Sequence, residues 1–122
     1  MAEFIGARTV LAVKSLEVAG SFFRDKLGLE VEFEVPGWAF MARGSWKVML
    51  GECADAMAAS ETGDHSYVSY VTVDDVDALY LEYSARSVPM IQEVSDKPWG
   101  MREFGICTPD GHRVMFGQPK EP

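Results

Sequence analysis

The chain contains little of what marks several large classes of protein. Only two cysteines occur in its 122 residues, Cys53 and Cys107, and they stand in unrelated contexts without the spacing of a metal motif. We therefore expect free thiols and a cytoplasmic location rather than a disulfide-stapled, secreted protein. No apolar run approaches the roughly 18 residues of a membrane-spanning helix, and the N-terminus lacks a charged-then-apolar secretion signal. These absences predict a protein that has no membrane partner.

Positive charge is also scarce. Eleven Lys and Arg residues oppose nineteen Asp and Glu residues, which gives a net charge of −8. A protein that binds nucleic acid needs a basic patch for the phosphates, so we expect no nucleic-acid partner. An acidic protein suits a cationic ligand instead. The sequence also lacks a Ser/His/Asp or Cys/His nucleophile pattern, a P-loop and a dinucleotide fingerprint.

What the sequence does contain is an internal repeat. Residues Pro98–Gly117 predict two strands around the turn Thr108–Gly111, whose sequence TPDG places Pro and Gly where a tight turn favours them. Trp38–Gly51 predicts a second hairpin, and its closing sequence KVMLG (47–51) resembles RVMFG (113–117). Such self-similarity indicates two copies of one structural unit.

The first unit begins with a β-prone run at Thr9–Val13. A helix follows, with Ser15 as its N-cap and Gly28 just after its last turn. Residues Leu29–Val35 then alternate apolar and acidic side chains, which predicts a half-buried strand before the first hairpin. After the linker Glu52–Asp64, in which a helical turn at 54–59 is possible, the order restarts.

The second unit has the same order of elements. Ser66–Val73 predicts a strand, Asp74 is the expected cap of a helix with Asp77 completing a variant capping box, and Val88–Val94 predicts a short strand before the second hairpin. The fold class is therefore α+β, with two β-α-β-β-β modules at approximately residues 7–52 and 65–118. The length suits a single domain over residues 1–122.

With its two modules, its VKSLEVAGSFFRDKLGLEV segment (13–31) and its closing PDGHRVMFG (109–117), the chain resembles the glyoxalase/bleomycin-resistance/dioxygenase superfamily over residues 7–118. The resemblance implies a curved, partly open barrel-like sheet with helices outside, around a cavity and within a homodimer. Metal-dependent members take one ligand from each of four strands. The matching positions here carry side chains unsuited to a hard or borderline divalent cation, so we expect no metal and no cofactor. These positions are Arg8, Met49, Val68 and Met115.

Within that superfamily the chain resembles the bleomycin-resistance proteins, which it matches in the DVDALYLEYS helix (75–84) and the second hairpin. The resemblance implies non-catalytic binding of a small, cationic and partly aromatic molecule, as in antibiotic sequestration. The alternative is a superfamily enzyme of the lyase, isomerase or dioxygenase type, metal-free or with unrecognised ligands such as Glu52, His65 or His112. A third possibility is a domain whose groove has lost its ligand.

Tryptophans stack on planar and cationic groups, which makes Trp38 and Trp99 candidate ligand contacts, although Trp99 could equally be a packing lid or a dimer contact. We expect one of Trp38 and Phe40 to face the helix and the other to face the cavity or solvent. Arg102 and Glu103 predict either a cross-strand ion pair or, at Glu103, a contact to a basic ligand. The predicted ligand-binding residues are Trp38, Phe40, Tyr70, Trp99, Arg102 and Glu103.

The acidic residues of one strand, one histidine and the third tryptophan carry separate expectations. The stripe Glu30, Glu32 and Glu34 suits a solvated strand face or a negative rim that attracts a cation. His112 follows the turn glycine, and we expect it to be exposed. Trp46 begins a strand, where a structural role is expected.

Overall fold

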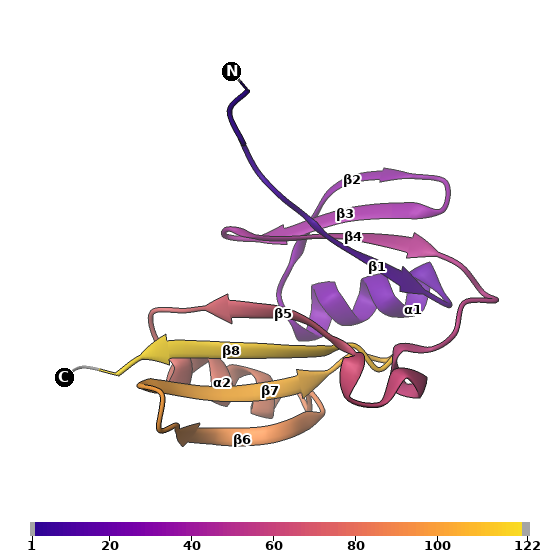
Figure 1. The fold of residues 1–122 in the computed structure, drawn as a ribbon. Coiled ribbons are helices and arrows are strands. Elements are labelled where there is room, and N and C mark those ends of the chain that lie inside the picture. The colour runs from indigo at the N-terminus through magenta and orange to yellow at the C-terminus, as the bar shows by residue number, and fades with distance from the viewer. Residues whose placement is uncertain (1, 121–122) are drawn as a thin grey trace.

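The computed structural model describes residues 2–120, apart from the side chains of Asp64 and His65. The first module contains β1 (Thr9–Val13), α1 (Leu16–Ser21), β2 (Glu30–Val35), β3 (Trp38–Arg43) and β4 (Trp46–Glu52), and a π-helical stretch (Phe22–Lys26) prolongs α1. Its four strands form one sheet in the order β1-β4-β3-β2, in which only β1 and β4 run parallel (Figure 1).

The second module repeats this arrangement. It contains β5 (Tyr67–Thr72), α2 (Val76–Ala85), β6 (Met90–Asp96), β7 (Met101–Cys107) and β8 (Arg113–Pro119), and its strand order is β5-β8-β7-β6. A 3₁₀ segment (Ala59–His65) lies in the linker. The predicted α+β class with two β-α-β-β-β modules is confirmed. The strands form two four-stranded sheets, not a closed barrel.

Local signals explain most element boundaries. The Ser15 side chain accepts a hydrogen bond from the Val18 backbone N–H, and Gly28, at φ 83°, ends the helical stretch as predicted. Two expectations were wrong. Asp75, not Asp74, caps α2 by accepting from the Ala78 N–H, because the chain turns one residue later. The helical turn of the linker begins at Ala59 instead of spanning residues 54–59.

One hydrophobic core serves both modules. Trp46 of β4 contacts Phe23 beside α1 at 6.1 Å between ring centroids and Phe116 of β8 at 5.5 Å. Phe116 in turn contacts Tyr83 of α2. The expected structural role of Trp46 is confirmed, since it joins the two sheets through their helix-covered faces. None of the helices in residues 2–120 is long and apolar enough to cross a membrane.

The opposite faces of the two sheets, which we call the open faces, carry exposed apolar side chains. The prediction of a half-buried β2 was wrong. All six of its residues are exposed, including Phe33 at 58%. The strand lies at the edge of its sheet, and its pairing with β3 shifts register between Val31 and Phe33. Other exposed apolar residues of the open faces are Val10, Val35, Trp38, Tyr70 and Ile91.

Candidate functional site

A buried carboxylate lies at the centre of the open face of the second sheet. Glu103 of β7 is only 4% exposed. Its Oε2 accepts a hydrogen bond of 2.5 Å from the Tyr70 hydroxyl of β5 and one of 3.5 Å from the indole Nε1 of Trp99, which lies between β6 and β7. The structure thus brings three of the six predicted ligand-binding residues together. We call Tyr70, Trp99 and Glu103 the carboxylate cluster.

Gly117 of β8 makes the cluster possible. It pairs with Glu103 in the sheet, and a Cβ atom at this position would lie 2.7 Å from the Tyr70 Cζ. The phenol ring therefore lies directly over the glycine and reaches the carboxylate. Burial, and secondarily the hydrogen bond to Glu103, raise the pKa of Tyr70 well above its ordinary value near 10. The phenol therefore remains a neutral donor to the Glu103 side chain.

Trp38 and Phe40 lie on the open face of the first sheet. The expectation that one of them faces the helix was wrong, because residues two apart on a strand share a face; Ala39 and Met41 between and after them are the buried ones. Trp38 covers Gly51, where a Cβ atom would lie 2.7 Å from its ring. Within residues 2–120, no hydrogen bond or ring contact joins Trp38 or Phe40 to the carboxylate cluster.

Phe40 has neighbours of its own on this face. Its ring packs against Phe33 at 5.7 Å, and the Arg8 guanidinium lies 5.4 Å from its centroid. Arg8 also pairs with Glu32 at 2.5 Å, and this hydrogen bond lowers the pKa of the Glu32 carboxyl. Lys47 approaches Glu32 as well, at 3.9 Å. The middle member of the acidic stripe is therefore neutralised, which weakens the stripe as a negative rim.

The structure separates Arg102 from Glu103. Consecutive strand residues point to opposite faces, and the Arg102 guanidinium accordingly pairs at 3.0 Å each with Asp77 of α2 and Asp96 of β6. Asp96 is its cross-strand partner. The ion-pair interpretation therefore describes Arg102, whose side chain lies on the helix side of the sheet, away from the carboxylate cluster.

The four positions matched to the metal ligands of other members do not fit a metal. Arg8 is ion-paired, Val68 packs against the core, and Met49 and Met115 offer only thioethers. Across the described residues, no group of three or more His, Cys, Asp or Glu side chains could hold a metal ion.

Two of the other ligands that we considered, Glu52 and His112, are hydrogen-bonded to neighbouring groups. Glu52 accepts from the Leu16 backbone N–H, and the side chain of His65 lies outside the described part. The expected exposure of His112 was wrong. His112 is buried. Ser60 of the linker lies against the preceding Gly111, the His112 backbone N–H donates to the Thr108 hydroxyl, and the imidazole Nδ1 lies 3.3 Å from the same hydroxyl.

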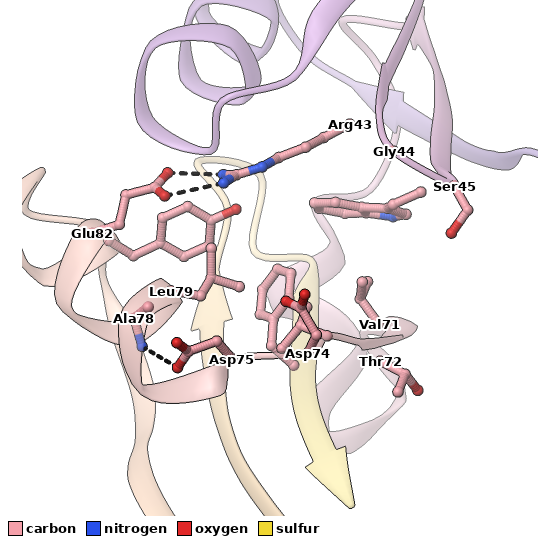
Figure 2. A pocket seen from close by; sticks show the side chains of 14 residues that line it. Arg43, Gly44, Ser45, Val71, Thr72, Asp74, Asp75, Ala78, Leu79 and Glu82 are labelled. Carbon is pink, nitrogen blue, oxygen red and sulfur yellow. Dashed lines mark hydrogen bonds and ion pairs between the residues drawn. The ribbon is translucent and has the colours of Figure 1, made fainter.

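Sequence reasoning missed a cavity of about 570 Å³ where the modules meet, on the helix-covered side (Figure 2). It lies between the β3–β4 turn and the start of α2, and residues of β5 and β8 complete it. Its parts come from segments that are far apart in the chain and carry no shared motif, so no sequence signal could have located it. The residues that line it are Arg43, Gly44, Ser45, Trp46, Val71, Thr72, Val73, Asp74, Asp75, Ala78, Leu79, Glu82, Tyr83 and Phe116.

The fold and the open faces define a protein built from two similar halves with polar and aromatic groups on its uncovered sheets. Residues 7–116 match the family model "Glyoxalase/Bleomycin resistance protein/Dioxygenase superfamily". The chain belongs to this superfamily, as the resemblance implied. A comparison with curated protein sequences found no match.

Solved structures with the same fold include binding proteins and an enzyme. The bleomycin-binding protein of Streptomyces verticillus, complexed with copper(II)-bleomycin, is 26% identical, with 100% of each chain covered and a TM-score of 0.72. TnmS3, an antibiotic-binding protein from Streptomyces sp. CB03234, is 22% identical, with 98% of this chain and 100% of that one covered and a TM-score of 0.75. A lactoylglutathione lyase from Agrobacterium tumefaciens is 23% identical, with 97% and 95% covered and a TM-score of 0.72.

Proposed function

We propose that the open faces bind a small, cationic and partly aromatic molecule without converting it, in the manner of antibiotic sequestration. The observation that carries this proposal is the carboxylate cluster. Glu103 is buried, yet both of its partners, a phenol and an indole, are neutral donors. The cluster therefore offers a largely uncompensated negative charge, which a ligand cation can neutralise.

Trp99 supplies the second element of recognition. Its side chain is 65% exposed although its Nε1 approaches Glu103, so one face of the indole is free to stack on a planar group of the ligand. The net charge of −8 attracts a cation from a distance. A bleomycin-binding protein and an antibiotic-binding protein of the same fold support an antibiotic as the ligand.

We further propose that two copies of the chain associate through their open faces, so that Trp38 and Phe40 of one copy approach the carboxylate cluster of the other. Exposed apolar residues on both sheets, together with the edge strand β2, favour such a partner. Sedimentation at micromolar concentration tests it. A particle of the monomer mass, 13.5 kDa, would contradict the association.

Calorimetric titration with metal-free and copper(II)-bleomycin, followed by a panel of other cationic glycopeptide and DNA-damaging antibiotics, tests the ligand class. Glu103→Gln keeps the shape of the side chain and removes its charge, so we expect it to weaken binding by about tenfold or more. Arg102→Gln is the matched control, because Arg102 neighbours Glu103 in the chain but faces the helix. We expect its affinity to equal that of the parent.

Attraction by charge and stacking on Trp99 should affect different rate constants. Salt should slow association, because it screens exposed charges beyond about 8 Å at physiological ionic strength. Trp99→Ala should instead speed dissociation, because it removes an aromatic anchor. A panel without any binder, or a binder that Glu103→Gln holds as tightly as the parent does, would refute the proposed function.

A further inference from the structure

The cavity at the junction of the modules is separate from the open faces. Strands β5 and β8 divide the two regions, because neighbouring residues of a strand point to opposite sides. On β5, Tyr70 belongs to the carboxylate cluster and Val71 lines the cavity; on β8, Gly117 lies under Tyr70 and Phe116 lines the cavity. A ligand in the cavity would thus leave the open faces free.

The apolar part of the cavity is buried and largely aromatic. Trp46, Tyr83 and Phe116 belong to the buried core, and Phe116 meets each of the other two rings nearly edge-on at 5.5 Å between centroids. Leu79 of α2 adds an aliphatic wall. The volume of about 570 Å³ falls in the range of small-molecule sites, roughly 300–1,000 Å³. Preformed walls of this kind suit a planar apolar group.

Three carboxylates line the cavity, and two of them are already engaged. Asp75 accepts from the Ala78 N–H at 3.0 Å. Glu82 forms two hydrogen bonds to Arg43, of 2.8 and 3.0 Å, and pairs with Arg86 at 2.9 Å. Figure 2 shows the Arg43–Glu82 pair crossing from the hairpin to α2 at one edge of the cavity. The positive charge of Arg43 is thereby committed to a protein partner.

Asp74 is different. Its carboxylate points into the space beneath Arg43, away from Ala78 (Figure 2). Within the described residues it has neither an ion pair nor a hydrogen-bond donor. Nearby, the buried indole Nε1 of Trp46 has no acceptor among the residues that the structure describes. The cavity therefore combines an aromatic lining with one carboxylate, on the exposed residue Asp74, that has no cationic partner in the described part of the chain.

From this combination we propose that the cavity is a second binding site and takes a small aromatic amine. The ring lies against Trp46, Phe116 and Leu79, and the protonated amine pairs with Asp74. An aromatic acid of the same size is excluded by charge, because Asp74 and Asp75 would repel it while Arg43 stays with Glu82. The site rests on the cavity alone and does not depend on the function proposed for the open faces.

Titration with tryptamine, followed by ¹H–¹⁵N correlation spectra, tests the site. We expect saturable shifts in the indole signal of Trp46 and the backbone signals of residues 72–79. Indole-3-propionate, which carries the same ring on an anionic chain, should produce none. Asp74→Asn should weaken tryptamine binding about tenfold or more, as loss of a charge-assisted hydrogen bond does. Ala78→Phe, which fills the cavity from an exposed helix position, should abolish it.

One control variant isolates the site. Asp55→Asn removes the same charge from an exposed loop residue that does not line the cavity. It should bind tryptamine as the parent does. The proposal is overturned if tryptamine shifts the signals of Tyr70 and Glu103 instead, if indole-3-propionate binds equally well, or if Asp74→Asn and Ala78→Phe leave binding unchanged.

Discussion

Gly117→Ala is the sharpest test of the geometry of the carboxylate cluster. The added methyl group would lie 2.7 Å from the Cζ of Tyr70 and closer still to its hydroxyl, so the phenol must leave its place over the strand. Tyr70 is 47% exposed and can swing toward solvent, while the backbone of Gly117 does not have to move. The substitution therefore breaks the hydrogen bond between Tyr70 and Glu103 rather than the sheet.

The expected loss of stability follows from two opposing contributions. A hydrogen bond to a charged group contributes about 1.5–3 kcal/mol, and Glu103 stays buried after losing its shorter bond. Alanine lowers the conformational entropy of the unfolded chain relative to glycine, which stabilises the folded state by about 0.4–1 kcal/mol. We therefore expect a net loss of about 1–2 kcal/mol, or a fall in Tm of roughly 4–12 °C for a domain near this size.

Thermal and urea unfolding at one fixed protein concentration measure this loss, and a double-mutant cycle assigns its cause. In a Tyr70→Ala background the methyl group meets no ring, so Gly117→Ala should be neutral or slightly stabilising there. Gly20→Ala in α1 is the matched control, because no atom lies within 4 Å of its added Cβ; it should raise stability by up to about 1 kcal/mol. An equal loss from Gly117→Ala with and without Tyr70 would refute the reasoning.

Three further predictions follow from ionisation and ligand chemistry. Burial raises the pKa of Tyr83 to about 12 and also raises that of Tyr70, so the stability that these neutral phenols contribute is complete below pH 10 and is lost as pH rises above it; in an ultraviolet titration, Tyr70→Phe and Tyr83→Phe should each remove a late-titrating phenol. Burial lowers the pKa of His112 below 6.5, so its contribution is complete above pH 6.5 and is lost as pH falls toward the lowered value; His112→Gln should flatten the acid limb of a plot of unfolding free energy against pH. Elemental analysis of protein purified without chelator should find far less than one equivalent of transition metal per chain, since Arg8, Val68, Met49 and Met115 are poor ligands; near one equivalent would contradict this.

The sequence predicted the fold well because local signals and the internal repeat agree. Ser15, Gly28 and the two hairpin turns locate element boundaries through backbone geometry that each residue carries by itself. The site was predicted less completely. Trp99 and Glu103 are close in the chain, which favours a contact between them. The hydrogen bond from Tyr70 to Glu103 depends on the pairing of β5 with β8, which the sequence does not specify.

Two errors have the same physical origin. The alternation in β2 is real, yet Phe33 and Val35 lie on an open face rather than in the core, and Val31 stays exposed although the register shift pairs it with the buried Met41. Likewise, His112 follows a turn and would be exposed on an isolated hairpin, but the linker around Ser60 covers that turn. Periodicity shows which residues share a face. Whether that face is buried depends on segments that lie far away in the sequence or on another chain.

The repeat also explains why the two open faces differ in chemistry. Gly51 and Gly117 occupy equivalent positions of the last strands, and each lies beneath an aromatic ring. Across the sheet, however, Gly51 pairs with Trp38, whereas Gly117 pairs with Glu103. One module thus presents an aromatic surface at the position where the other presents a carboxylate. If the open faces of two copies meet as proposed, each groove combines one surface of each kind, which matches a ligand that is aromatic at one end and cationic at the other.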